Sequence, residues 1–238
     1  MATYKKTSGV NVKSYTTDPD RTYPSSFEGQ LYYNSSDGQF KFIGLGAGAW
    51  ASGGSLNTAA KDRGGVGLQT AALCFGGQIS PPSTVNTEQY DGSSWTETTE
   101  LNNGRAYLAG DGIQTAAIAI GGEPGPGAAD FTEIWNGSTW TEVSDLNLAR
   151  TNLASSKVGT TTASLAFGGS NSGFKNETES WDGTSWTEVA DLATARQNLS
   201  GAGTNSLGLA FAGTVGTPGL TNTEEWTLVH ALKKVTTG

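Results

Sequence analysis

The sequence predicts an all-β protein built from repeats of about 45 residues, each repeat supplying four short strands. Three observations lead to this prediction. An apolar run that ends in glycine recurs four times, aromatic and charged landmarks recur at the same step, and the composition is unusual. The 238 residues include 34 glycines but only 15% charged residues, which disfavours helical bundles and coiled coils.

The apolar run is clearest at Thr70–Gly77. Near copies lie at Thr115–Gly122 and Thr162–Gly169, and a more divergent copy lies at Leu207–Gly213. A short apolar run that ends in glycine indicates a buried strand leading into a tight turn. The alanines within these runs suit strands that converge around a common axis, where bulky side chains would clash.

Several other residues recur at a constant step. Equivalent positions are separated by 45 or 46 residues, which fixes the period of the repeat. The recurring residues are Trp50, Trp95, Trp140 and Trp186; Tyr90, Trp135, Trp181 and Trp226; Glu88, Glu133, Glu179 and Glu224; Leu56, Leu101, Leu146 and Leu192; and Arg105, Arg150 and Arg196.

Each repeat is expected to contain four strands. The apolar run is the first, and the segment with the glutamate and the aromatic residue is the second. A turn such as Asp91–Gly92 leads to a third strand at the tryptophan, and the fourth passes through Ala106–Ala109. Apolar residues alternate instead of recurring every three or four positions, so a helical repeat is disfavoured. A four-stranded antiparallel unit of this length is typical of the blade of a β-propeller.

The two ends of the repeat region complement each other. The first unit has only its third and fourth strands, at Trp50 and at Leu56–Asn57, whereas the last has only its first and second, at Leu207–Gly213 and Thr223–Trp226. Such half-blades predict a four-bladed propeller that is closed by pairing of its N- and C-terminal half-blades. Closure also removes exposed sheet edges. An open solenoid and a larger ring shared by two chains are the alternatives.

The chain before the repeats divides into two parts. Residues 1–28 lack periodicity and are expected to form an extended docking arm. Residues 29–44 predict a β-hairpin around the turn Asn34–Gly38, and residues 45–238 form the propeller. The N-terminus lacks the apolar segment of a secretory signal, and no run is long enough to span a bilayer. The net charge of −8 disfavours contact with nucleic acid or anionic membranes.

The order Gly-Gly, Glu-x-aromatic, Trp and Leu-x-x-x-Arg, over residues 45–226, resembles the kelch family of β-propellers. The likeness is closer to kelch-like repeats of virion and tail proteins of tailed bacteriophages, which share patterns like Phe27–Asn34, Gly48–Trp50 and Leu56–Thr58. The chain departs from the kelch pattern because it lacks the tyrosine before the tryptophan. Its last unit also has Ala212 in place of the first glycine, and no third-strand tryptophan.

This resemblance implies a structural or adhesion component of a virion. The protein is then expected to be made in the host cytoplasm and to join the particle through residues 1–28, which bind other virion proteins. The resemblance implies no catalytic residue.

The residues themselves favour a protein without enzymatic activity, cofactor or metal. His230 is the only histidine and Cys74 the only cysteine, which excludes histidine-based triads, multi-histidine metal sites and internal disulfides. Carboxylates are abundant, so a polysaccharide-cleaving enzyme is the third hypothesis, although no pair of carboxylates stands out.

Two sets of residues are candidates for a role. The glutamate, arginine and tryptophan ladders are interpreted as structural, with each arginine bonding carbonyls or pairing with a neighbouring glutamate and each tryptophan packing between blades. The loops that follow the glycines differ from repeat to repeat, and such loops usually carry binding. Phe131, Phe174 and Leu220 in these loops are the candidate contacts of a protein partner or a glycan. A glycan-binding host-attachment module is therefore the second hypothesis.

Overall fold

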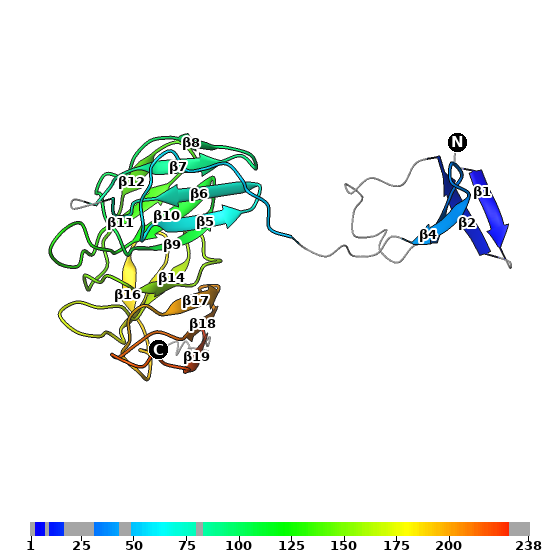
Figure 1. Ribbon diagram of the computed structural model, residues 1–238. Coiled ribbons are helices and arrows are strands. Elements are labelled where there is room, and N and C mark those ends of the chain that lie inside the picture. The colour runs from blue at the N-terminus through cyan, green and yellow to red at the C-terminus, as the bar shows by residue number, and fades with distance from the viewer. Residues whose placement is uncertain (1–2, 8–9, 17–30, 43–48, 80–82, 229–238) are drawn as a thin grey trace, which may run out of the picture. The chain divides into compact units, whose positions relative to one another are not determined.

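The computed structural model describes residues 3–7, 10–16, 31–42, 49–79 and 83–228 (Figure 1). The regular secondary structure of these residues is entirely β-strand, so the predicted all-β class is confirmed. The chain divides into two compact units, Met1–Ser52 and Gly53–Gly238. No strand of one unit pairs with a strand of the other among the described residues, so each unit is described by itself.

The first unit holds one sheet with the strand order β1-β2-β3-β4. Strands β2 and β3 are parallel, and the other pairs are antiparallel. The strands are β1 (Thr3–Thr7), β2 (Val10–Tyr15), β3 (Leu31–Asn34) and β4 (Gln39–Phe42).

The expected hairpin is present as β3 and β4, but the described part of the expected arm is not an isolated extended segment. Residues 3–16 form a hairpin of their own that joins the sheet through β2. The physical reason is that this stretch has apolar anchors: Val12 is buried, and the rings of Tyr15 and Tyr32 meet edge to face at 5.9 Å. Residues 17–28 of the expected arm lie outside the described residues.

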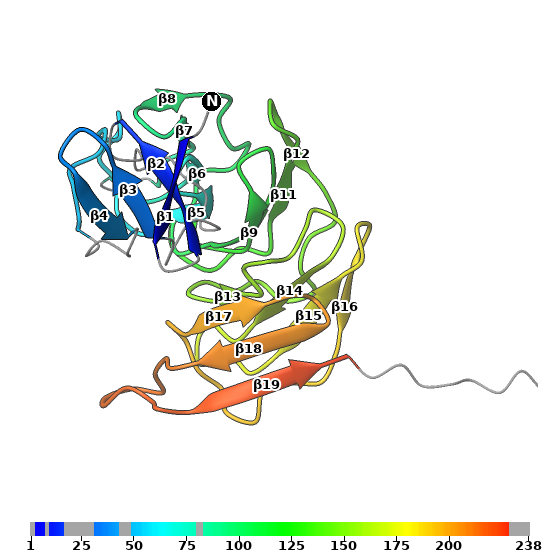
Figure 2. The ribbon, with the colours of Figure 1, turned by 90° about the vertical axis from the view of Figure 1, so that its right-hand side faces the viewer.

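The second unit contains four antiparallel sheets that follow one another along the chain (Figure 2). Sheets I, II and III have four strands each, and sheet IV has three among the described residues. Sheet I is β5 (Gly64–Leu68), β6 (Ala71–Phe75), β7 (Thr87–Tyr90) and β8 (Trp95–Glu97); sheet II is β9 (Ala109–Ile113), β10 (Ala116–Ile120), β11 (Thr132–Trp135) and β12 (Trp140–Glu142). Sheet III is β13 (Ala154–Ser155), β14 (Ser164–Phe167), β15 (Thr178–Trp181) and β16 (Trp186–Glu188); sheet IV is β17 (Ser200–Gly203), β18 (Leu207–Phe211) and β19 (Thr223–Thr227).

The apolar run is the second strand of its sheet instead of the innermost one. In sheet II, β9 precedes the apolar strand β10 and pairs with it through a two-residue connection that brings Ile113 opposite Ala116. The strand predicted as the last of one repeat therefore pairs with the first strand of the next repeat, because the short connection favours local antiparallel pairing. The strands β5, β9, β13 and β17 hold the inner position, and each lies next to its counterpart in the following sheet.

The core lies between successive sheets. Leu73 and Phe75 of sheet I pack with Trp140 of sheet II, and Ile118 and Ile120 of sheet II pack in one cluster with Trp186 of sheet III. A third cluster joins Leu165 and Phe167 of sheet III to Ala210 of sheet IV. Each apolar strand thus sends side chains toward both neighbouring sheets, which explains why its sequence is apolar throughout instead of alternating.

The two ends of the repeat region are not paired in the structure. Residues 49–63 contain no strand, although a third strand is expected at Trp50, and the Trp50 side chain is fully exposed. Sheet IV ends at β19, which lies at its outer edge (Figure 2). The structure therefore supports four successive sheets, while ring closure and the number of blades are taken up below as a proposal.

Candidate functional site

Four buried ion pairs recur through the second unit. In each sheet, an arginine on the segment that precedes the first strand pairs with a glutamate on the third strand. The pairs are Arg63–Glu88 at 3.0 Å, Arg105–Glu133, Arg150–Glu179 at 2.7 Å and Arg196–Glu224 at 2.8 Å. The arginine that closes one sequence repeat therefore binds the glutamate of the next repeat.

The arginines also bond main-chain carbonyls. Arg105 Nε donates to the carbonyl of Gly121 at 2.7 Å, and Arg150 Nη1 donates to the carbonyl of Glu177 at 2.6 Å. Burial lowers the pKa of Arg105 and Arg150, and the charge of the paired glutamate opposes that effect. These two guanidinium groups are 0% exposed, so they present no charge to a ligand.

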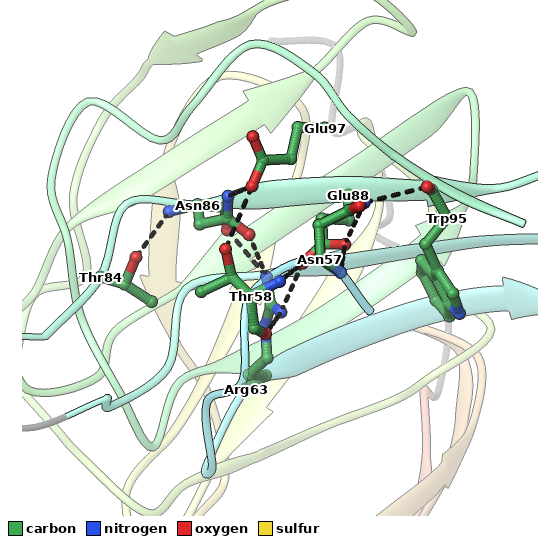
Figure 3. A network of polar contacts seen from close by, with 8 residues as sticks. All are labelled: Asn57, Thr58, Arg63, Thr84, Asn86, Glu88, Trp95 and Glu97. Atoms are coloured by element: carbon green, nitrogen blue, oxygen red, sulfur yellow. Dashed lines mark hydrogen bonds and ion pairs between the residues drawn. The ribbon is translucent and has the colours of Figure 1, made fainter. Parts of the chain in front are cut away.

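The first member of this ladder, Arg63, was missed by the sequence prediction. Arg63 lies seven residues after Leu56, whereas Arg105 lies four residues after Leu101, so a fixed step does not reach it. Its spatial place is nevertheless equivalent, because it pairs with Glu88 (Figure 3).

The glutamates of the ladder are fully engaged as hydrogen-bond acceptors. Glu88 Oε2 accepts from the main-chain N–H of Asn57 at 2.7 Å and from its Nδ2 at 3.0 Å, while Oε1 accepts from Thr58 N at 3.2 Å (Figure 3). Burial alone would raise the pKa of Glu88, but these bonds and the one from Arg63 outweigh it, and the pKa is lowered. A buried carboxylate held in this way acts as a structural acceptor and has no path to a substrate.

The same asparagine position joins each ion pair to the outer strand of its sheet. Asn57 Nδ2 donates to the carbonyl of Trp95 at 2.9 Å, and Asn147 Nδ2 donates to that of Trp186 at 3.1 Å. Sheet IV has Ala193 at this position, which offers only its main-chain N–H to Glu224. The contact that holds the outer strand is therefore missing from the sequence of the last repeat.

The tryptophan ladder joins neighbouring sheets. Trp140 of sheet II donates its Nε1–H to Thr87 Oγ1 of sheet I at 3.1 Å and packs on Phe75 with ring centroids 5.0 Å apart. Trp186 of sheet III donates in the same way to Thr132 Oγ1 of sheet II at 3.0 Å. Trp95 is half-buried and Trp50 is exposed, so the first two members of the ladder do not make this contact in the structure.

A ring of unusual backbone conformations was also missed by the sequence prediction. Asp62, Tyr107, Asn152 and Asn198 all have φ between 52° and 58°. The main-chain N–H of each of the last three donates at 3.0 Å to the carbonyl of the preceding member. Their spacing of 45, 45 and 46 residues was available, but four positions with three different residue types hide the repeat. Asparagine and aspartate are common at positive φ, whereas tyrosine is rare there.

Two cavities open beside this ring. One, of about 280 Å³, is lined by the four ring residues and by the residue that follows each of them. The other, also of about 280 Å³, lies among the loops after β6 and β10 and is lined by Gln78, Ser83, Ala106, Tyr107, Glu123, Gly125 and Pro126. Tyr107 lines both cavities, so we call their combined lining the loop face.

Tyr107 gives the loop face an aromatic ring and a polar tip. The negative charge of Asp62 raises the pKa of the Tyr107 hydroxyl, which therefore stays a phenol that donates a hydrogen bond. Asn152 and Asn198 add amide donors and acceptors around the same cavity. Binding sites for small molecules typically combine apolar or aromatic walls with a few polar groups of this kind.

The three loop residues selected from the sequence lie elsewhere. Phe131 and Leu220 are half-buried and Phe174 is exposed, and none of them lines the two cavities. The carbonyl of Phe131 accepts from Gly121 N at 2.9 Å, and Leu220 N donates to Gly213 O at 2.8 Å. Main-chain bonds therefore fix Phe131 and Leu220 at the ends of their loops.

One buried carboxylate has no counterpart in the other repeats. Asp111 on β9 accepts hydrogen bonds from Ser156 Oγ and Ser164 Oγ at 2.6 Å each, and from Gly159 N at 2.7 Å. Burial raises its pKa, although these bonds oppose the shift. The side chain is 0% exposed and its partners belong to the chain around β13 and β14, so it joins sheets II and III.

The features expected of an enzyme or metal protein can be examined only in part. Among the described residues, no group of three or more His, Cys, Asp or Glu side chains is arranged to hold a metal ion. Cys74 is half-buried, and burial raises the pKa of its thiol. His230 lies outside the described residues.

Comparisons with known proteins assign no family. No family model matches the chain, and no curated protein is similar to it. In the part of the chain that the structure describes, no helix has the length and hydrophobicity needed to cross a membrane. The proposals below therefore depend on the residues and on the geometry given above.

Proposed function

We propose that this chain is a non-enzymatic structural protein of a tailed-bacteriophage virion. In this proposal the repeat region is a closed, four-bladed kelch-like propeller, and the N-terminal unit, including residues 1–28, attaches it to other virion proteins. One observation carries the proposal. The recurring charged side chains of the repeats are consumed in buried ion pairs, which leaves a rigid scaffold with variable loops and no catalytic constellation among the described residues.

The four-bladed arrangement is supported by the inner strands. Strands β5, β9, β13 and β17 follow one another as neighbours, as the inner strands of blades around an axis would. The ring of N–H to carbonyl bonds runs from Asp62 to Asn198 through all four sheets. One cavity is lined by residues from each of the four sheets, as expected for the mouth of a central channel.

The attachment role is supported by the separate N-terminal sheet. Strands β1 to β4 pair only with one another among the described residues, so the unit does not depend on the repeat region for its hydrogen bonds. A removable sheet of this kind is suited to docking on a partner. Its outer strand β4 also exposes Phe42, which is 72% accessible.

Deletion of residues 2–42 tests the attachment. The truncated chain keeps Trp50 and the whole second unit, so it should unfold cooperatively with a midpoint close to that of the full chain. Tagged full-length and truncated proteins would be produced in infected host cells and quantified in purified particles by mass spectrometry. We expect the full chain in the particles and less than a tenth of that amount of the truncated chain. Equal incorporation of both would refute attachment through this unit.

A second function, recognition of a host surface glycan, is favoured by the loop face. Tyr107 lies between two cavities that carry polar groups, and aromatic rings with hydrogen-bonding neighbours are suited to a polysaccharide. Tyr107→Asn tests this site, because asparagine occupies the equivalent positions 152 and 198 with the same positive φ. We expect saturable binding of host polysaccharide by the full chain, at least tenfold weaker binding by the variant, and equal unfolding midpoints. Equal binding by both proteins would exclude this site, and release of sugar products in the same assay would favour a polysaccharide-cleaving enzyme.

A further inference from the structure

Each tryptophan of the outer strands fills a socket on the preceding sheet. For Trp140 the socket consists of Phe75, at the end of the apolar strand, and Thr87, at the start of the next strand. For Trp186 the equivalent residues are Ile120, in the same core cluster, and Thr132. The aromatic partner within its own sheet completes the site, with ring centroids 5.4 Å apart for Trp135–Trp140 and 5.3 Å for Trp181–Trp186.

Sheets III and IV form a third socket of the same kind. The residues equivalent to Phe75, Thr87 and Trp135 are Phe167, Thr178 and Trp226, and all three line one pocket together with Leu165, Leu192 and Ala210. No described tryptophan donates to Thr178 Oγ1. The socket thus has its walls and its hydrogen-bond acceptor, but no tryptophan occupies it.

The sequence contains one tryptophan that fits this position. Trp50 lies one step of 45 residues before Trp95, belongs to no sheet and is fully exposed. The C-terminal segment offers no alternative, because the residue one step of 46 after Trp186 is Leu232.

We propose that residues 49–52 form the fourth strand of sheet IV, antiparallel to β19, with Trp50 in the socket formed by Phe167, Thr178 and Trp226. The register follows from the other sheets. Trp95 pairs with Tyr90 and Glu97 with Glu88, so Trp50 pairs with Trp226 and Ser52 with Glu224. Trp50 Nε1 then donates to Thr178 Oγ1. This inference rests on the proposed closed four-bladed ring and assigns the residues that close it.

Two further contacts agree with this strand. The segment after Trp50 is already held on sheet I, since Asn57 and Arg63 bind Glu88 as Asn102 and Arg105 bind Glu133. The chain is therefore placed to leave an outer strand at residues 49–52. Closure would also bring Trp95 of sheet I to Phe211 and Thr223 of sheet IV, which are the equivalents of Phe75 and Thr87.

The occupant gains in two ways from docking. The Trp50 ring leaves water for a pocket whose lining is mainly apolar, and the free edge of β19 gains a partner for its main-chain groups. The strand lacks the asparagine contact that other outer strands have, because position 193 is alanine. The hydrophobic contact of Trp50 is thus the main interaction left to hold it.

A disulfide trap tests the register directly. In a Cys74→Ala background, Ala51→Cys and Glu225→Cys place two thiols at positions that are Cα partners in the proposed pairing. Facing residues of an antiparallel pair lie about 4.5–5.5 Å apart, within the range of a disulfide. The matched control pairs Ala51→Cys with Thr227→Cys, which shifts one thiol by two residues along β19. We expect an intramolecular disulfide in the first protein, seen as monomer on a non-reducing gel, and at least tenfold less in the control.

Absence of this disulfide, or its formation only between chains, would overturn the proposal; the second result would show that another copy supplies the strand. The trap is independent of particle incorporation, so a failed trap with normal loss of the truncated chain from particles would reject the closure alone. A second measurement uses Thr178→Val beside Thr132→Val. Both variants should lower the urea midpoint of unfolding by a similar amount if both threonines accept from a tryptophan. A loss in Thr132→Val alone would contradict the docking of Trp50.

Discussion

Replacing Glu179 by glutamine tests the structural role of the charged ladder. Glu179 is 1% exposed and its partner Arg150 is 0% exposed, with 2.7 Å between Arg150 Nη2 and Glu179 Oε1. The other carboxylate oxygen accepts from Asn147 N at 2.7 Å and Asn147 Nδ2 at 2.8 Å. Glutamine keeps the shape of the side chain but removes its charge and turns one acceptor oxygen into a donor.

The magnitude follows from what is left behind. Burial already lowers the pKa of Arg150, and the charge of Glu179 is the leading effect that opposes it, so the variant leaves a buried cation without its counterion. Breaking a buried ion pair by removing one partner costs about 3–5 kcal/mol. For a chain of this size, 1 kcal/mol changes the melting temperature by about 2–4 °C, so a decrease of about 6–20 °C is expected.

Glu188→Gln is the matched control. Glu188 faces Glu179 across β15 and β16, but its side chain is exposed, so its removal should cost less than about 1 kcal/mol. Both variants would be unfolded in urea and followed by circular dichroism, because the chain has seven tryptophans whose fluorescence would overlap. If the two variants lost equal stability, the buried pairs would not be the elements that hold the sheets.

Three other changes probe different contacts. Asp111→Asn should be most favourable at high pH: a raised folded-state pKa means that the wild-type stability from this group is complete below about pH 4 and is lost as pH rises through the folded value, so the difference in urea midpoint between variant and wild type should grow from pH 4 to pH 7. Trp140→Phe removes the bond to Thr87 but keeps an aromatic ring, so a loss of about 1–3 kcal/mol is expected in urea unfolding, and no loss would exclude the Nε1 contact. Gly121→Ala should lower the melting temperature, because φ is +58° and a Cβ would lie 2.6 Å from the carbonyl oxygen of Arg150, whereas Gly125→Ala meets no atom within 4 Å and should leave it unchanged.

The repeat allowed much of the fold to be predicted. The step of 45 or 46 residues located three of the four strands in each complete sheet, because it follows landmarks such as Trp140 and Glu133 that lie on those strands. The position of β9 in its sheet was not predicted correctly, since an apolar run does not say on which side its neighbours pair. The hairpin of residues 3–16 was missed because two short polar strands have little apolar periodicity and depend on β3 for a partner.

The candidate site was harder to predict. The arginine and glutamate positions could be found because their residue types repeat, and the structure shows that each is already bonded within the sheet. The ring of Asp62, Tyr107, Asn152 and Asn198 repeats in backbone conformation but not in side chain, so residue identity does not reveal it. Asp111 has no repeat at all, and its partners Ser156 and Ser164 come from a different sheet.

The departures from the repeat are the places where this chain differs from a symmetric scaffold. A residue kept in every sheet must satisfy the same contacts four times, which leaves it little freedom to recognise a ligand. Tyr107 shares its backbone geometry with three polar residues but adds an aromatic ring to the loop face, so the change affects what that face can bind and not how the chain folds. Ala193 acts in the opposite way, because it removes a bond that three other sheets could use or do use to hold an outer strand. If Trp50 docks as proposed, Ala193→Asn should strengthen sheet IV in the full chain, and this gain should decrease in Trp50→Ala, where the carbonyl it binds is no longer held in place. A gain of equal size in both backgrounds, measured as the shift in urea midpoint, would instead assign the effect to Glu224 alone.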